Sequence, residues 1–324
     1  MKTRRLGKTG FEVSEIGLGC WQLGGDFGPV EDEAAKAILD AAQAAGITFW
    51  DTADVYGGGL SERRIGAHAK GETVKVATKL GRSSRLFPNH YTKDGLRESL
   101  VGSAERLGVK SLDLVQLHCV PTPVLREGKI FGWMDELKAE GLMQHWGASV
   151  ETIDEGLLCL DQPGCATLQI IFNLLRQDAA KDLLPKAAER DVGIIVRLPL
   201  ASGLLSGKFD KNTRFDPSDH RNYNRDGQAF SVGETFSGIP FERGVELVQE
   251  LKGLAPEGMP LSQFALRWIL DHPQVSTVIA GVSKPEQIAD NVAASERKSL
   301  FPALMKQLGE WYEREVRPEI RGGV

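Results

Sequence analysis

The chain has 324 residues, a length typical of one large α/β domain or of two small ones. With 41% hydrophobic and 26% charged residues, it carries enough apolar surface to offset the entropy of the chain, which excludes disorder as its main state. A formal net charge of −5 argues against a protein that wraps nucleic acid or lies on an anionic membrane.

The cysteines and the N-terminus indicate a reducing, cytoplasmic setting. No cysteine belongs to a CxxC pair or has a histidine at zinc-finger spacing, so we expect free thiols and no metal site. The N-terminal MKTRRLGKTGF is positively charged but precedes no apolar run, and no stretch of eighteen apolar residues occurs. We therefore expect neither a signal peptide nor a membrane helix.

Short, apolar, β-branched segments alternate along the chain with longer segments of helical periodicity. In chain order, the pattern predicts strands at 13–20, 47–51, 73–79, 111–118, 142–149, 166–173, 192–199 and 275–281. It predicts helices at 32–46, 61–71, 92–108, 130–141, 151–161, 180–191 and 285–298. This alternation predicts parallel strands joined by crossover helices. Eight such units match a (β/α)8 TIM barrel, which we expect to form a single domain over residues 1–324. A doubly wound open sheet is the alternative fold.

Two segments fall outside this alternation. Residues 1–12 contain the turn-forming Leu6-Gly7-Lys8-Thr9-Gly10 and predict a hairpin that caps the floor of the barrel. Residues 209–240 are polar and rich in turn residues. Because they follow the seventh predicted strand, we expect a long loop over the mouth of the barrel, and a loop of this length is usually functional or mobile.

Glycine-rich phosphate motifs are incomplete in this chain. Gly17-Leu18-Gly19 begins like a dinucleotide fingerprint, but Gln22 stands where the third glycine belongs. Gly7-Lys8-Thr9 resembles the end of a P-loop, but Lys2 replaces the upstream glycine. An open dinucleotide-binding sheet therefore lacks its main sequence evidence.

Polar side chains fall at the ends of successive predicted strands, and a barrel gathers those ends on one face. They are Asp51, Lys79, His118, Ser149 and Arg197, with Gln169 inside the sixth strand and Tyr56 in the glycine-rich turn after Asp51. Each has an ordinary interpretation when taken alone: a turn cap, a solvated lysine, a structural histidine or a turn aromatic. Their recurrence at successive strand ends indicates a catalytic site.

The chemistry of four of these residues is complementary. A free tyrosine has a pKa of about 10, and a nearby ammonium such as Lys79 would lower the pKa of Tyr56 toward that of a useful acid. Asp51 would keep Lys79 charged, and His118 would orient a carbonyl oxygen. The set suits protonation of an oxygen whose carbon is attacked, and hydride from a bound cofactor is the natural attacking species.

These residues, in the segments FWDTADVYG, VATK and LVQLH, resemble the Asp–Tyr–Lys–His tetrad of the aldo-keto reductase superfamily, and the resemblance extends over nearly the whole chain. It implies that Asp51, Tyr56, Lys79 and His118 are catalytic and that Tyr56 is the proton donor. The same resemblance implies cofactor contacts from the GLGCW, GAS, LQIIFNLL, LPLASGLLSGK and TVIAGVSKPEQIADN segments. The implied contacts are Cys20, Trp21, Asp51, Ser149, Gln169, Arg197, Pro199, Leu200, Ser202, Gly203, Lys208, Gly281, Ser283, Lys284, Gln287, Asp290 and Asn291.

The chain departs from the family pattern at four of its positions. Val150 replaces an asparagine that contacts the carboxamide, and Arg197 replaces the aromatic residue that stacks on the nicotinamide. Arg197 is either a surface residue paired with a loop acid such as Asp216 or Asp219, or a guanidinium stacked on the ring. Gly281 and Gln287 stand where many members have Lys and Arg, although Lys284 could contact a 2′-phosphate.

The resemblance implies an NADP(H)-dependent oxidoreductase that reduces aldehydes or ketones, with NADPH favoured and NADH as the rival cofactor. An alternative is a cofactor-binding regulatory subunit like the β-subunits of potassium channels, which would have negligible turnover. A metal-dependent lyase lacks a carboxylate–histidine ligand set in the sequence. We expect a small-molecule carbonyl substrate and neither nucleic acid nor membrane as a partner; the sequence leaves the substrate and the oligomeric state open.

Overall fold

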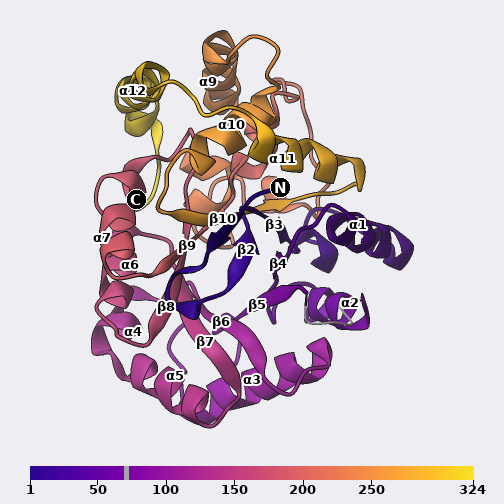
Figure 1. Cartoon of the computed structure of the whole chain (residues 1–324), viewed down its shortest axis with the longest axis vertical. Coiled ribbons are helices and arrows are strands. Elements are labelled where there is room, and N and C mark those ends of the chain that lie inside the picture. The colour runs from indigo at the N-terminus through magenta and orange to yellow at the C-terminus, as the bar shows by residue number, and fades with distance from the viewer. Residues whose placement is uncertain (69–72) are drawn as a thin grey trace.

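Eight parallel strands close into a barrel in the computed structural model, which describes residues 1–68 and 73–324 (Figure 1). They are β3 (Ile16–Gly19), β4 (Phe49–Asp51), β5 (Lys75–Leu80), β6 (Leu112–His118), β7 (Met143–Ser149), β8 (Cys165–Ile171), β9 (Gly193–Arg197) and β10 (Val275–Gly281). Most of their residues are buried, as expected for strands covered on both faces. The pairing of β10 with β3 closes the barrel. The predicted (β/α)8 barrel is therefore confirmed, and the open doubly wound sheet is wrong.

Helices surround the barrel, and each predicted helix has a counterpart. The described helices are α1 (Asp32–Ala44), α2 (Leu60–His68), α3 (Lys93–Leu107), α4 (Thr122–Glu127), α5 (Lys129–Ala139), α6 (Ile153–Leu160), α7 (Leu183–Glu189), α8 (His220–Tyr223), α9 (Phe241–Leu254), α10 (Leu261–Leu270), α11 (Glu286–Glu296) and α12 (Pro302–Trp311). The end of the helix predicted at 61–71 lies outside the described residues. Among the described helices without a predicted counterpart, α9, α10 and α12 are the longest. Within residues 1–68 and 73–324, no helix has both the length and the apolar character needed to cross a membrane.

The N-terminal hairpin closes the floor of the barrel, as predicted. Its strands β1 (Thr3–Arg5) and β2 (Glu12–Ser14) pair antiparallel. Between them, Gly7 adopts φ +50, and a Cβ at this position would come within 2.2 Å of the Gly193 amide nitrogen, so glycine permits the close approach. The predicted strand 13–20 is in fact split: its first residues pair with β1, whereas Ile16–Gly19 pairs with β10 and β4. One straight strand cannot make both sets of contacts.

The long loop at 209–240 is fixed by aromatic packing and carries short helical segments. It contains α8 and two 3-10 turns, Val232–Glu234 and Phe236–Gly238. Phe209, Phe215 and Phe236 pack against Phe241 at the start of α9, with ring centroids 5.0 to 6.2 Å apart. This packing holds both ends of the loop while its middle part reaches the barrel mouth.

Candidate active site

The strand register brings the predicted polar residues to one end of the barrel. His118 pairs with Ser149, and Ser149 pairs with Gln169, so three neighbouring strands present polar groups at the same level. On the other edge of β6, Lys79 of β5 pairs with Gln116. His118, Ser149 and Gln169 line a cavity of about 690 Å³ at the carboxyl ends of the strands, the size of a small-molecule site.

Asp51 and Tyr56 line the cavity and are joined by the buried Lys79, which bonds to both side chains. Lys79 Nζ donates hydrogen bonds to Asp51, to the Thr52 carbonyl at 2.8 Å and to the Tyr56 hydroxyl at 3.1 Å. Asp51 and Lys79 are buried, with 2% and 1% exposure, so each charge depends on the other for compensation. The sequence-predicted arrangement of these three residues is present in the structure.

Gln116 completes this contact and was missed by the sequence analysis. Its Nε2 donates to the second oxygen of Asp51 at 3.0 Å, and Gln169 Nε2 donates to the same oxygen at 2.8 Å. Gln169 Oε1 lies 3.4 Å from the Ser149 hydroxyl. Gln116 stands two residues before His118 and therefore on the same face of its strand, a spacing that could have identified it.

Burial raises the pKa of Tyr56 to about 12, although Lys79 acts in the opposite direction. Lys79 does lower the pKa of Tyr56, as expected, but the expected net decrease is wrong, because the pKa is raised overall. Desolvation of the phenolate outweighs the neighbouring ammonium, and Asp51 adds a second opposing effect. The phenol is consequently protonated throughout the neutral pH range and available as a proton donor.

His118 faces Tyr56 as a neutral imidazole. The two rings meet edge to face with centroids 5.8 Å apart. Burial lowers the pKa of His118 well below its ordinary value, and the positive charges of Lys79, Arg82 and Arg197 lower it further. A neutral ring carries one N–H donor and suits the orientation of a carbonyl oxygen rather than the donation of a proton.

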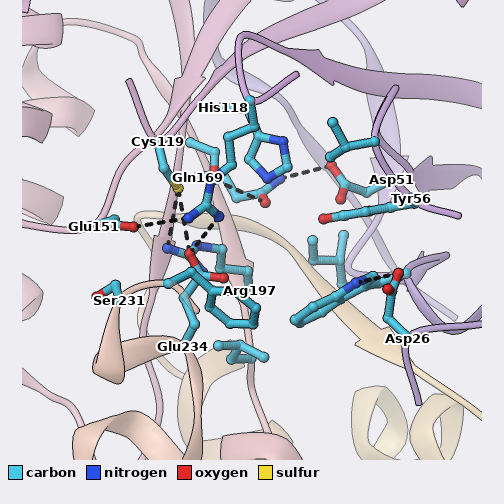
Figure 2. A pocket seen from close by; sticks show the side chains of 18 of the residues that line it. Asp26, Asp51, Tyr56, His118, Cys119, Glu151, Gln169, Arg197, Ser231 and Glu234 are labelled. Carbon is cyan, nitrogen blue, oxygen red and sulfur yellow. Dashed lines mark hydrogen bonds and ion pairs between the residues drawn. The ribbon is translucent and has the colours of Figure 1, made fainter. Parts of the chain in front are cut away.

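The cavity gathers part of the predicted cofactor set. Its walls include Cys20, Trp21, Asp51, Ser149, Gln169, Arg197, Pro199 and Gly281, together with Tyr56 and His118. Figure 2 shows Asp51 and Tyr56 on one side of the cavity and Arg197, Glu151 and Glu234 on the other, with His118 between them. Trp21 stacks on Tyr56 with ring centroids 5.8 Å apart.

The remaining predicted cofactor residues lie outside the cavity walls. They are Leu200, Ser202, Gly203 and Lys208, in and beside the turn Ala201–Ser206, and Ser283, Lys284, Gln287, Asp290 and Asn291, just before and within α11. Ser202 Oγ is committed to the long loop, since it donates to the Glu234 carbonyl and accepts from the Phe236 amide. Gln287 Oε1 accepts from the backbone amides of Ser283 at 2.7 Å and Lys284 at 3.1 Å.

Arg197 is a buried residue, which contradicts its interpretation as a surface arginine paired with Asp216 or Asp219. Its guanidinium donates to the Val150 carbonyl at 3.1 Å and lies 3.8 Å from Glu234 Oε1. Asp219 instead accepts from Arg221. The pairing with an acid of the loop exists, but the acid is Glu234, which no feature of the local sequence distinguishes.

Cys119, Glu151 and Glu234 place three ligand atoms within 4.8 Å of one another, a cluster that the sequence analysis missed. Two guanidinium groups already contact its carboxylates: Arg82 reaches Glu234 at 3.0 Å and Glu151 at 3.7 Å, and Arg197 reaches Glu234. Two positive charges at this distance disfavour a further cation.

Three buried polar atoms on the cavity walls have no hydrogen-bond partner within residues 1–68 and 73–324. They are Gln22 Oε1, His118 Nδ1 and Arg197 Nε. Buried polar atoms are normally satisfied, because an unmade hydrogen bond costs about 1–3 kcal/mol. The cavity therefore fits a ligand with several polar groups of its own.

Comparison with known proteins identifies relatives along nearly the whole chain. Residues 15–313 match the model of the Aldo/keto reductase family. The chain is 31% identical to a probable voltage-gated potassium channel subunit beta from Oryza sativa, over 98% of this chain and 97% of the relative. It is 30% identical to an L-galactose dehydrogenase from Arabidopsis thaliana, over 93% and 90%. The structure of a glycerol dehydrogenase from Gluconobacter oxydans superposes with a TM-score of 0.79 at 27% identity, over 100% and 98%.

Proposed function

Because this chain belongs to the aldo/keto reductase family, we propose that it is an NADP(H)-dependent oxidoreductase that reduces aldehyde or ketone carbonyls to alcohols. The observation that carries the proposal is the 3.1 Å contact between Lys79 Nζ and the Tyr56 hydroxyl at the cavity wall. A proton donor beside a buried cation suits the protonation of an oxygen that gains negative charge.

The cavity fits the nicotinamide end of a cofactor and a small carbonyl compound in size and in its unsatisfied polar atoms. We assign the nicotinamide end to Cys20, Trp21, Asp51, Ser149, Gln169, Arg197 and Pro199. We assign the phosphates and adenosine to Leu200, Ser202, Gly203, Lys208, Gly281, Ser283, Lys284, Gln287, Asp290 and Asn291. When bound, the cofactor supplies the hydride.

The remaining steps belong to the side chains of this protein. Tyr56 donates its phenolic proton to the carbonyl oxygen as negative charge develops there. Lys79 stabilises the phenolate that remains, and Asp51 keeps Lys79 charged and in place. His118, neutral because its pKa is lowered, donates an imidazole N–H that orients the same oxygen.

A screen of substrates and cofactors tests this function. We expect the purified protein to oxidise NADPH, followed by absorbance, in the presence of some members of a panel of aldehydes and ketones. NADH is assayed in parallel. Absence of carbonyl-dependent oxidation of either cofactor across the panel would contradict the proposal.

The rice relative favours one second candidate, a cofactor-binding subunit of a larger assembly with negligible turnover. That function predicts tight cofactor binding without turnover of the carbonyl panel. Native mass measurement of the protein recovered from its source would then show a stable complex with another chain. Turnover at rates ordinary for an enzyme, about 1–10³ s⁻¹, would exclude it.

We predict that Lys284→Ala weakens NADPH binding about 10- to 150-fold and leaves NADH binding almost unchanged. Lys284 is exposed just before α11, and a charge-assisted hydrogen bond to the extra phosphate of NADPH is worth about 1.5–3 kcal/mol. Titration of both cofactors against both proteins measures the effect, with the exposed Lys298→Ala as the control. Equal weakening of both cofactors would place Lys284 away from the phosphate.

A further inference from the structure

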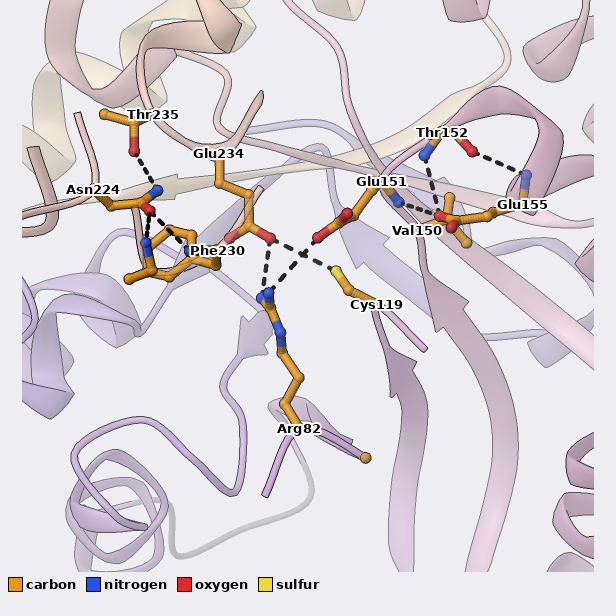
Figure 3. A network of polar contacts seen from close by, with 12 residues as sticks. Arg82, Cys119, Val150, Glu151, Thr152, Glu155, Asn224, Phe230, Glu234 and Thr235 are labelled. Carbon is orange, nitrogen blue, oxygen red and sulfur yellow. Dashed lines mark hydrogen bonds and ion pairs between the residues drawn. The ribbon is translucent and has the colours of Figure 1, made fainter. Parts of the chain in front are cut away.

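Glu234 lies between two arginines that come from opposite sides of the barrel. Arg82 follows β5 and Arg197 ends β9, strands that are four places apart in the closed ring of eight. Glu234 Oε1 is 3.0 Å from Arg82 and 3.8 Å from Arg197. Figure 3 shows Arg82 pointing toward both Glu234 and Glu151, with Cys119 beside them. The carboxylate of Glu234 therefore stands over the barrel mouth as the shared counterion of both guanidiniums.

The backbone around Glu234 is held in place independently of these ion pairs. The Glu234 carbonyl accepts from Ser202 Oγ, and the side-chain hydroxyl of the next residue, Thr235, accepts from Asn224 Nδ2 at 3.0 Å. Asn224 Oδ1 in turn accepts from the amides of Ala229 and Phe230. Removal of the carboxylate charge should thus leave the loop in position.

Glu234 is the main negative charge available to Arg197. Although burial opposes its ionisation, Arg82 and Arg197 hold the pKa of Glu234 below its ordinary value, so it is ionised at neutral pH. Glu151 compensates less, because burial and the neighbouring Glu234 raise its pKa to about 7. Glu151 also pairs with Arg82, at 3.7 Å, and has no ion pair with Arg197 within the described part of the chain.

We propose that Glu234 is the countercharge that lets Arg197 occupy the nicotinamide position, and that it thereby sets the affinity for the oxidised cofactor relative to the reduced one. The inference rests on the proposed function, which places the nicotinamide beside Arg197. The oxidised ring is positive and the reduced ring is neutral, so an uncompensated buried guanidinium would repel only the oxidised form. Glu234, 3.8 Å from Arg197, offsets part of that repulsion while it also pairs with Arg82 at 3.0 Å.

Two substitutions test this inference with effects of opposite sign. Glu234→Gln keeps the shape of the side chain and removes its charge, and should raise the ratio of the dissociation constants of NADP⁺ and NADPH about 10- to 100-fold. Unit charges several ångström apart in a partly buried site interact with this order of magnitude. Arg197→Tyr removes the positive charge and should lower the same ratio.

The measurement is titration of both redox forms against each variant, followed by tryptophan fluorescence or calorimetry. Glu234→Asp retains the charge and should keep the wild-type ratio. Asp216→Asn removes an exposed acid of the same loop, which bonds Ser218, and should also leave the ratio unchanged. A role of Glu234 in holding the loop alone would weaken both redox forms equally.

The outcomes distinguish failure of the inference about Glu234 from failure of the proposed oxidoreductase function. Opposite shifts in Glu234→Gln and Arg197→Tyr support the inference. An unchanged ratio in both variants overturns it while leaving the proposed function intact. If Glu234→Gln does not fold, an unchanged or raised ratio in Arg197→Tyr still overturns it. Failure of the wild-type protein to bind either redox form overturns the proposed function and the inference together.

Discussion

Tyr56→Phe should reduce turnover about 10²- to 10⁴-fold and leave cofactor affinity nearly unchanged. The change removes the phenolic proton and keeps the ring that stacks on Trp21 and faces His118. General acid catalysis typically contributes a factor of this size. Single-turnover kinetics with a saturating cofactor measure the loss in the chemical step, and fluorescence titration measures cofactor binding.

Tyr223→Phe is the matched control, because Tyr223 also lines the cavity but belongs to the long loop and is 38% exposed. We expect its turnover to stay within a few-fold of the wild type. If Tyr56→Phe kept more than about half of the wild-type rate under chemistry-limited conditions, Tyr56 would not be the general acid.

Lys79→Met should be as damaging to turnover as the loss of the Tyr56 hydroxyl, and it should also destabilise the fold. Lys79 is the group that opposes the effect of burial on the pKa of Tyr56 and stabilises the phenolate after proton transfer. Its removal also leaves Asp51 as a buried charge without its ion-pair partner, which typically costs about 3–5 kcal/mol. Urea unfolding measures the stability, and kinetics on the folded fraction measure the turnover.

The control for Lys79→Met lies on the same strand. Lys75→Met removes a partly exposed lysine that pairs with Asp113 at 3.3 Å, and it should change both quantities little. Asp51→Asn should be milder than Lys79→Met, because the amide can still accept from Lys79. Wild-type turnover in Lys79→Met would contradict the role assigned to this residue.

The pH profile of alcohol oxidation should shift in opposite directions in Lys79→Met and Asp51→Asn. This direction requires Tyr56 as a deprotonated base, and since burial raises the pKa of Tyr56 to about 12, the rate should rise with pH throughout the range below that value. Lys79 lowers that pKa, so Lys79→Met should move the acidic limb to higher pH. Asp51 raises it, so Asp51→Asn should move the limb to lower pH. A limb unmoved by either change would mean that these residues do not tune Tyr56.

The sequence by itself determined the barrel and the position of the tetrad. Alternating apolar and amphipathic segments specify parallel strands with crossover helices, and a closed parallel barrel brings every carboxyl strand end to one face. A polar residue at a strand end, such as Asp51 or His118, is thereby placed at the cavity from its position in the chain alone. Helices α9, α10 and α12 were not assigned, although their amphipathic pattern was available in the sequence.

Only the tertiary structure decided the electrostatics of the site. The bond between Arg82 and Glu234 joins residues 152 positions apart, and the loop that carries Glu234 has no periodicity that fixes where its side chains point. The net shift in the pKa of Tyr56 likewise depends on how far burial outweighs Lys79, which is a property of the packed cavity. Strand-end positions follow from local pattern and topology, whereas charge pairing and desolvation depend on distances between distant segments, which exist only once the chain has folded.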